Sequence, residues 1–332
     1  MRPKGDSAVY RPDLGQVVME YVEGPTMGFI GLEVMPVFET SKQASTYPVI
    51  PKEALLSISD VSRAPRGTYN RDDWVYETGK YATVEKGTEE PIDDGERALF
   101  GQVAPGLTDL IATQRAWKKI LRAQEKRIAD KVFNSTNFTA HAVANEWDDA
   151  ANATPIEDVN DGIISLRQQC GMLPDALIIA YSTFRRLKEC DQIVDRLKYT
   201  FPGIDVNRMT SEQLAAVFDV PRVLIGGEVY NANGKGLDAS IMDIWDDEYA
   251  ALVKISGGLD IREPGVGRTF LWTEDSPENP IVESYREENR RSDIIRVRHH
   301  VDECLMRSYK EDNSVDSDIA AACMYLMSNI TT

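Results

Sequence analysis

The sequence contains three histidines and four cysteines that could supply nitrogen and sulfur ligands to a metal ion. His299 and His300 are adjacent, and Asp302 and Cys304 follow them closely. Together these four residues offer the ligand types that zinc uses in proteins. On a strand, however, adjacent side chains point to opposite faces, so at most one of the two histidines can lie near Asp302. We therefore expect no metal site here.

The motifs that mark common catalytic sites are missing from the sequence. A phosphate-binding loop needs Gly, four residues and then Gly-Lys-Ser/Thr, and the stretch Gly227–Gly236 has another spacing and lacks the hydroxyl. Gly265–Arg268 lacks the third glycine of a dinucleotide-binding turn, and no G-x-S-x-G nucleophile elbow occurs. Carboxylate runs such as Asp246–Glu248 are typical of solvated surface. We expect no catalytic residue and no cofactor.

The cysteines (Cys170, Cys190, Cys304 and Cys323) are scattered along the chain and form no C-x-x-C pair. In a reducing compartment such residues are typical of small core side chains, and a disulfide or a metal role is the weaker alternative. Residues Met1–Asp6 are polar, without the apolar segment of a signal peptide after them. No run approaches the ~20 apolar residues of a membrane helix. We expect a soluble protein that is made in the cytoplasm.

Basic side chains gather on one predicted helix, Thr108–Phe133, although the formal net charge of the chain is −17. That acidity disfavours a free nucleic-acid-binding domain. At about 100° per residue, one side of the helix is mainly apolar. Its residues are Leu110, Gln114, Trp117, Ile120, Leu121, Ile128 and Val132. The opposite side carries Arg115, Lys118, Lys119, Arg122 and Lys126. Two interpretations stay open for the basic side: a solvated helix face, or a stripe that meets a polyanion or an acidic neighbour.

A long polar arm precedes this helix. Phe29–Val37 predicts an extended segment, and residues 51–100 combine Gly, Pro and charge with the strand-type stretch Tyr69–Val84. Connections of this length inside compact domains are usually functional or disordered, and the strand-type residues favour order. An ordered arm without its own core is most simply stabilised on neighbouring subunits. We therefore expect Gly31–Phe133 to be ordered only in the company of other copies.

Two further regions complete the predicted α+β fold. Residues 155–255 predict a compact α/β unit, in which Thr154–Glu157 matches a capping box with proline at the first helical position, and Gly171 supplies a left-handed helix end. Its predicted core strands are Ala176–Ala180 and Pro221–Gly226, and a small sheet is completed by Ile241–Trp245 and Ala250–Val253. After it, three long strands are predicted at Thr269–Trp272, Ile281–Tyr285 and Ile294–Arg298.

This order of parts resembles the major capsid protein of tailed double-stranded DNA bacteriophages, with the HK97-like fold that encapsulins share. Short stretches typical of such coats are Ala64–Gly67, Glu89–Asp94, Glu283–Arg286 and Arg291–Asp293. The resemblance implies six parts: an N-terminal arm (1–50), an extended E-loop hairpin (51–100), a P-domain with a spine helix (101–154), an α/β A-domain (155–267), returning P-domain strands (268–305) and a C-terminal segment (306–332) that joins the A-domain.

The resemblance also implies a structural function without catalysis. Coats of this family self-assemble into hexamers and pentamers of an icosahedral head around packaged double-stranded DNA. Assembly takes place in the host cytoplasm with scaffolding, portal and in some cases decoration proteins, and no membrane is involved. Aromatic anchors and arginine pairs would then form the intersubunit contacts. The candidate residues are Arg63, Arg66, Trp74, Tyr76, Tyr81, Arg290 and Arg291. The basic helix face would meet DNA phosphates without reading sequence.

Two alternatives remain at this point. An encapsulin-like shell would enclose a cargo enzyme in place of a genome, so the contents of purified particles discriminate between the two shells. A soluble hydrolase would instead be a monomer or small oligomer with a pocket lined by carboxylates of perturbed pKa.

Overall fold

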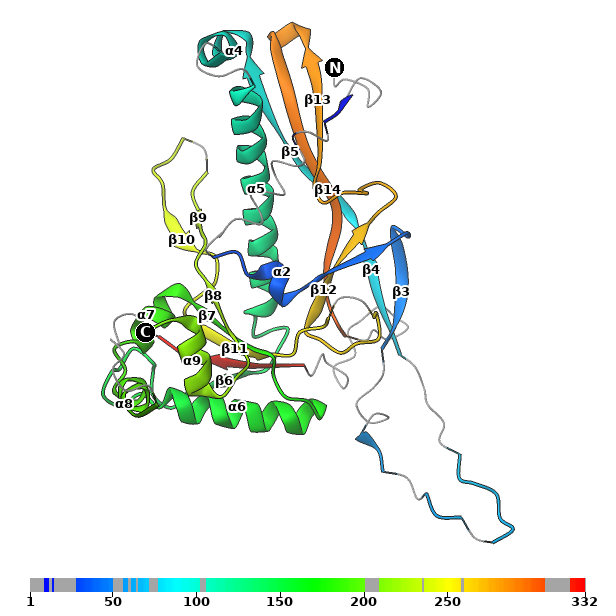
Figure 1. Cartoon of the computed structure of the whole chain (residues 1–332), viewed down its shortest axis with the longest axis vertical. Coiled ribbons are helices and arrows are strands. Elements are labelled where there is room, and N and C mark those ends of the chain that lie inside the picture. The colour runs from blue at the N-terminus through cyan, green and yellow to red at the C-terminus, as the bar shows by residue number, and fades with distance from the viewer. Residues whose placement is uncertain are drawn as a thin grey trace.

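One long helix, α5 (Leu107–Val132), joins two β-sheets and gives the chain its elongated shape (Figure 1). The computed structural model describes residues 9–11, 14, 28–49, 56–58, 61–63, 65–71, 77–101, 106–200, 209–234, 236–257, 260–307 and 323–331. The mixture of separate helices and mainly antiparallel sheets confirms the expected α+β class. The helix begins and ends within a residue of its predicted bounds.

The larger sheet is built around β14, a strand of 14 residues. The strand order is β1, β13, β14, β12, β2, and β5 pairs with the other edge of β14. The bounds are β1 Val9–Tyr10, β2 Val37–Thr40, β5 Val84–Asp93, β12 Gly267–Trp272, β13 Ile281–Glu287 and β14 Ser292–Leu305. Only β2 and β12 pair in parallel among these described strands. Helix α4 (Asp94–Gly101) follows β5 at one end, where η3 (Glu288–Arg290) connects β13 to β14.

The second sheet belongs to the α/β unit, with the order β6, β15, β11, β7, β8. Its strands are β6 Ala140–Ala142, β7 Ala176–Ala180, β8 Val223–Gly226, β11 Tyr249–Val253 and β15 Met324–Ser328. The surrounding helices are α6 Pro155–Cys170, α7 Tyr181–Leu187, α8 Asp191–Thr200 and α9 Ser211–Phe218. Strand β7 has the bounds that its apolar run predicts, and all five of its residues are buried. The late strand β15 lies between β6 and β11, so the chain returns to this sheet near its end.

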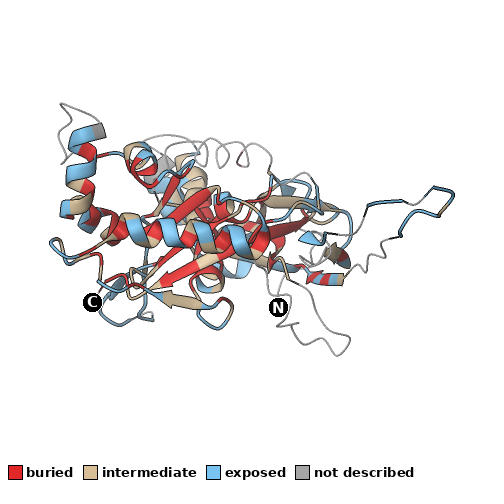
Figure 2. Ribbon diagram, turned by 90° about the horizontal axis from the view of Figure 1, so that it is seen from below, coloured by how far each residue is buried: buried red, intermediate tan, exposed pale blue. Residues whose placement is uncertain are grey.

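Helix α5 packs on both sheets. Its first half, including Ala116, Trp117 and Ile120, shares a buried cluster with β5, β13 and β14. Its last turns, including Ile128 and Val132, share another cluster with the α/β unit. Figure 2, which views the molecule from below, shows buried residues in the middle of the molecule and exposed residues around them. The apolar side of α5 therefore holds both sheets against the same helix.

The expectation that Gly31–Phe133 has no core within its own chain is wrong for most of its described residues. Strand β5 pairs antiparallel with β14 along its whole length, from Val84 opposite Val301 to Asp93 opposite Ser292. Strands β3 (Ala44–Val49) and β4 (Glu77–Ala82) pair with each other beside this sheet. Because β14 lies about 200 residues later in the sequence, nothing local to the arm reveals this partner.

Three smaller predictions also need correction. The extended segment Phe29–Val37 contains a single helical turn, α2 (Gly31–Val34), before β2 begins. Ile241–Trp245 does not join the small sheet, because β10 (Ile241–Asp243) forms a separate, exposed hairpin with β9 (Val229–Asn231). Thr154 precedes α6 but makes no side-chain capping bond, whereas the capping box found in the structure joins Thr210 and Gln213 at α9. The left-handed end at Gly171 is confirmed, with φ 72°.

A buried carboxylate explains why α2 is helical. Glu125 of α5 is 4% exposed, and it accepts hydrogen bonds from the N–H groups of Ile30 (2.9 Å) and Gly31 (2.8 Å). These are donors that the start of a short helix leaves without a backbone partner. The indole N–H of Trp245 donates a third bond of 2.6 Å. Burial raises the pKa of Glu125, against the opposing effect of these three bonds. One side chain thus joins α5, α2 and the segment before β11.

Gly31 is required by this arrangement for reasons of space. A Cβ at this position would lie 2.6 Å from Oε2 of Glu125 and 3.0 Å from Cδ1 of Ile128. The first of these separations is shorter than any normal contact, and the carboxylate is held in place by its other bonds. A larger residue at position 31 would therefore displace α2 from α5.

We predict that Glu125→Ala lowers the free energy of unfolding by on the order of 3 kcal/mol, because it leaves three buried donors without an acceptor. Urea unfolding followed by circular dichroism measures this change. Glu212→Ala, at an exposed position of α9, is the matched control and should change stability by less than about 0.5 kcal/mol. Equal stability of the two variants would contradict the role assigned to Glu125.

Candidate functional site

The residues between β3 and β4 include a loop that projects away from both sheets (Figures 1 and 2). Its described apolar side chains are strongly exposed: Ile58 is 100% exposed, Val61 91% and Tyr69 70%. Arg63 orders part of this loop, since its Nε donates to the Gly67 carbonyl at 2.7 Å and its guanidinium lies 4.7 Å from the Tyr69 ring centroid. Apolar side chains this exposed on a projecting loop are candidates for contact with a partner.

The predicted contact residues of this arm fall into three groups. Arg63 and Arg66 lie on the exposed loop, whereas Trp74 and Tyr76 lie outside the described residues. Tyr81 requires a correction, because it is 6% exposed and packs in the core of its own chain. Its ring is stacked on Phe270 with centroids 4.2 Å apart, and its hydroxyl shares a 2.8 Å hydrogen bond with Thr40. Aromatic residues suit a core as well as an interface, so the sequence could not separate the two.

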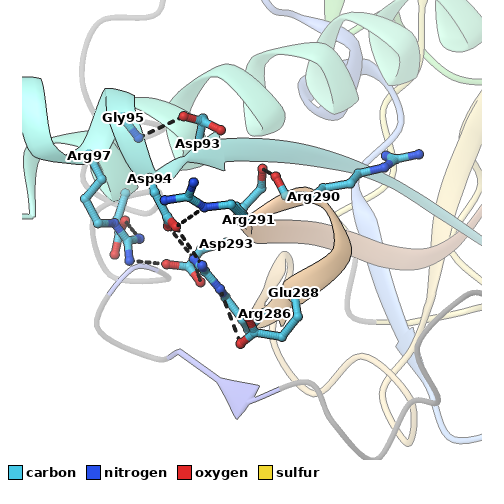
Figure 3. Close-up of polar contacts among 11 residues, drawn as sticks. Asp93, Asp94, Gly95, Arg97, Arg286, Glu288, Arg290, Arg291 and Asp293 are labelled. Carbon is cyan, nitrogen blue, oxygen red and sulfur yellow. Dashed lines mark hydrogen bonds and ion pairs between the residues drawn. The ribbon is translucent and has the colours of Figure 1, made fainter.

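A network of charged residues occupies the far end of the larger sheet, opposite the loop (Figures 1 and 3). Arg286 donates to Asp94 at 2.8 Å and to Asp293 at 3.3 Å. Arg97 joins Asp293 to Asp109, the latter at 2.7 Å. The hydrogen bond from Arg286 holds the pKa of Asp94 below its ordinary value. These pairs fix the start of α4 and of α5 to the β13–β14 end of the sheet.

Arg290 and Arg291, both predicted contact residues, lie at the edge of this charged network. Their side chains are 73% and 80% exposed, and their ion pairs to Glu287 and Asp94 are long, at 3.7 Å each. Figure 3 shows Arg290 pointing away from the network. Arg291 has φ 49°, a left-handed conformation that turns the chain into β14. Both guanidinium groups remain accessible to a partner, and their intersubunit role stays a prediction.

Two residues of the predicted basic stripe hold a carboxylate of the same chain. Arg115 and Lys119 lie 3.1 Å and 3.0 Å from the two carboxylate oxygens of Glu90 on β5. Glu90 is 8% exposed, so the two cations compensate a largely buried charge. This pairing supports a structural role of the stripe, namely fixing α5 to β5.

The remaining stripe residues are also engaged within the chain. Arg122 lies 3.2 Å from Glu228, Lys126 pairs with Asp130 one turn along the helix, and Lys118 is half-buried. The stripe is therefore interleaved with carboxylates that the helical pattern alone does not reveal. Its proposed orientation toward DNA is not tested by these contacts and stays a prediction.

A second buried carboxylate, Glu303 of β14, was missed by the sequence analysis. It is 1% exposed and accepts two bonds from Arg127 (2.7 Å and 3.1 Å) and one from Lys86 (2.8 Å). Burial alone would raise the pKa of Glu303, but Arg127 and then Lys86 lower it to about 2. Burial also lowers the pKa of the neighbouring His299 to about 4. Arg127, Lys86 and Glu303 together connect α5, β5 and β14.

The histidines on β14 face different surroundings, as expected for a strand. His299 packs edge-on to Trp117, with ring centroids 6.3 Å apart, whereas His300 packs against Trp272 at 4.8 Å. Across the described ranges, no three His, Cys, Asp or Glu side chains are grouped as metal ligands. Within the same ranges, no helix combines the length and apolar character needed to cross a membrane.

Comparison with known sequences identifies a phage relative. No protein-family model matches the chain. The major capsid protein of Burkholderia phage BcepMu is 28% identical over 275 residues, which cover 81% of this chain and 84% of that protein. The resemblance to phage major capsid proteins that the sequence suggests is therefore confirmed.

Solved structures share the fold at lower identity. A phage-related protein from Bordetella bronchiseptica covers 97% of this chain and 98% of its own, with a TM-score of 0.69 and 19% identity. The mature capsid of bacteriophage PhiM1 (TM-score 0.53, 10% identity) covers 88% of this chain and 85% of its own. A virus-like particle from Pyrococcus furiosus (TM-score 0.53, 9% identity) covers 95% and 98%. These likenesses show a common fold and leave the assignment of E-loop and spine helix as predictions.

We predict that the buried pairs of Glu303 make the fold acid-labile. The pKa of this carboxyl is about 2 in the folded chain against an ordinary value of 4.5, so its stabilisation is complete above pH 4.5 and is lost as the pH falls toward 2. Glu303→Gln should cost on the order of 3 kcal/mol of unfolding free energy at pH 7. Urea titrations at several pH values should show this difference shrinking below pH 4.5. A difference that is constant from pH 7 to 3 would contradict the charge-based role.

Proposed function

We propose that this chain is the major capsid protein of a tailed phage, a non-enzymatic subunit that self-assembles as hexamers and pentamers into an icosahedral head around double-stranded DNA. The observation that carries the proposal is the 28% identity to the BcepMu major capsid protein over most of both chains. The shared fold of phage-related structures supports it. The chain would be part of the virion capsid, after assembly in the host cytoplasm.

The shape of the chain suits a shell subunit. The loop with Ile58 and Val61 exposes apolar surface that has no cover within the described chain, and a second copy would supply that cover. We assign this projecting part as the E-loop. Its range is narrower than residues 51–100, because β4 pairs with β3 and β5 pairs with β14 of the same chain. Arg290 and Arg291, at the opposite end of the larger sheet, are available for a further neighbour.

The proposed contact with DNA is weak and does not depend on the DNA sequence. Arg115 and Lys119 already compensate Glu90, and the formal net charge of −17 limits adhesion to polyanions. Phosphate contacts from such a surface would position DNA near the shell without binding it tightly. Scaffolding, portal and decoration proteins are further partners that the proposed function includes.

An encapsulin-like shell is the second candidate. The virus-like particle from Pyrococcus furiosus has the same TM-score to this chain as the PhiM1 capsid, so the fold alone does not separate the two functions. The contents of purified particles separate them directly. Nuclease-protected DNA would support the phage head, whereas an enclosed protein without nucleic acid would support the second candidate.

Electron microscopy of the full chain, expressed with and without a scaffolding protein, tests shell formation itself. We expect closed particles or rings of capsomers. Discrete monomers or small oligomers under both conditions would overturn the proposed function.

We predict that the double variant Ile58→Asp, Val61→Asp prevents shell assembly and leaves the stability of the isolated chain unchanged, because both side chains are more than 90% exposed. Light scattering and electron microscopy measure assembly, and thermal unfolding measures stability. Ile58→Leu, Val61→Ile is the matched control, since it keeps the apolar surface and should assemble. Normal shells from the aspartate variant would refute the role of this loop.

A further inference from the structure

A surface pocket of about 610 Å³ lies at the base of the projecting loop. Residues of β3 and β4, the strands that lead into and out of this loop, form one part of its wall. The end of β14 and the last turn of α5 form the rest. Lys80, Lys131 and Arg307 all line the pocket, in a chain whose formal net charge is −17. The pocket is therefore a local concentration of positive charge.

One edge of the Arg307 guanidinium lacks a hydrogen-bond acceptor in the described part of the chain. Its Nη1 donates a 3.3 Å hydrogen bond to the side-chain oxygen of Asn137. Its Nε is buried and makes no hydrogen bond, and Nη2 makes none with the described residues. A buried donor without an acceptor costs free energy. The edge formed by Nε and Nη2 is thus ready to donate two parallel bonds.

The same edge of the guanidinium holds a carboxylate at three other arginines of this chain. The pairs are Arg127 with Glu303, Arg262 with Asp260 and Arg298 with Glu283, with N···O distances between 2.7 and 3.2 Å. Two parallel N–H groups match the planar geometry of a carboxylate. The unpaired edge of Arg307 therefore has the charge and the shape to bind one more carboxylate.

Asn137 holds Lys131 and Arg307 near each other. Its side-chain amide donates to the Lys131 carbonyl at 2.9 Å, and its side-chain oxygen accepts the bond from Arg307. The Lys131 ammonium donates to the backbone carbonyl of Glu303, an acceptor without net charge. Among the described residues, neither Lys131 nor Arg307 forms a salt bridge. Two cations without an ionic partner thus lie in one pocket.

The acidic residues that line the pocket offset this charge only in part. The Glu303 carboxylate already accepts bonds from Arg127 and Lys86. The carboxylate of Asp302 accepts a 3.0 Å bond from the N–H of Ala82, which ties it to β4. Asp302 thus contributes one negative charge against the three positive charges of the pocket.

We propose that this pocket binds a carboxylate of a second copy of the chain, with Nε and Nη2 of Arg307 as paired donors and Lys131 as the second cation. A DNA phosphate is disfavoured, because Asp302 and the net charge of −17 repel a polyanion. The chain itself offers 54 Asp and Glu residues as sources of a single carboxylate. The pocket also adjoins the projecting loop, which is already proposed to contact a neighbour.

The second copy as the source of the carboxylate rests on the proposed function, whereas the ability of the pocket to bind a carboxylate does not. Two experiments therefore separate the two statements. One uses the unassembled full chain with a small carboxylate probe. The other uses assembled particles.

The first experiment titrates the unassembled chain with succinate, a dicarboxylate, at an ionic strength kept constant with sodium chloride. We expect saturable NMR shifts of the backbone amides of Ser45 and Thr46, which line the pocket. Arg307→Gln should weaken binding by roughly tenfold or more, because the paired donors are lost. Arg262→Gln is the matched control, since its guanidinium pairs with Asp260 of its own chain. Circular dichroism shows whether both variants are folded.

The second experiment cross-links particles assembled from an equal mixture of unlabelled and ¹⁵N-labelled chains. A carbodiimide joins an amine to a carboxylate that it contacts, and mass spectrometry of the peptides shows whether the two groups come from different copies. We expect Lys131 or Lys80 joined to an Asp or Glu of another copy. Lys198 is the control, because it pairs with Asp195 of its own chain at 3.4 Å and should be joined only within one copy.

Each arm has an outcome that overturns its part of the proposal. Absence of saturable shifts with succinate, or unchanged affinity in Arg307→Gln, would remove the carboxylate site. Links from Lys131 and Lys80 that stay within one copy would exclude the second copy as the source. Shifts caused by a double-stranded DNA fragment and not by succinate would assign the pocket to DNA instead. Failure to form any particle would count against the proposed function, and the succinate titration would still decide whether the site exists.

Discussion

The carboxylate of Glu125 is the contact on which the relative placement of the two sheets depends. It lies in the last third of α5, where the helix passes from the larger sheet to the α/β unit, and it accepts hydrogen bonds from Ile30, Gly31 and Trp245. A buried charge is costly unless hydrogen bonds satisfy it, so these three donors are required in one geometry. An apolar contact at this position would tolerate sliding of α2 along α5. The three directed hydrogen bonds of the carboxylate prevent this sliding. The segment that leads into β2 is therefore fixed in position at its start.

The structure also explains where sequence reasoning succeeds and where it fails. Helix α5 and strand β7 follow from local patterns, one periodic and one continuously apolar, so their bounds could be predicted closely. The pairing of β5 with β14 could not, because the two strands are distant in the sequence and β5 alone resembles an exposed arm. The candidate site divides in the same way. The exposure of Arg290 and Arg291 could be predicted, because both residues lie in a highly charged turn. The burial of Tyr81 could not, because it depends on Phe270, a residue of a remote strand.

Basic residues pair with buried carboxylates inside the subunit, although the net charge of the chain is negative. Arg127 and Lys86 compensate Glu303, and Arg115 and Lys119 compensate Glu90, in both cases between α5 and a strand of the larger sheet. Exposed ion pairs contribute little to stability, but a pair with a buried carboxylate fixes position, because breaking it leaves an uncompensated charge. Much of the basic side of α5 is therefore committed to the fold.

Strand β14 has a mechanical consequence. It runs unbroken from Ser292 in the charged network to Leu305, whose carbonyl accepts a bond from the Tyr47 hydroxyl at the base of the projecting loop. Fourteen residues of extended chain span about 45 Å. A force applied along this strand loads its ladder hydrogen bonds sideways and together, since they lie perpendicular to the strand. The strand is thus stiff under tension, and a force applied at the loop reaches the opposite end of the subunit without separating the strands of the sheet one hydrogen bond at a time.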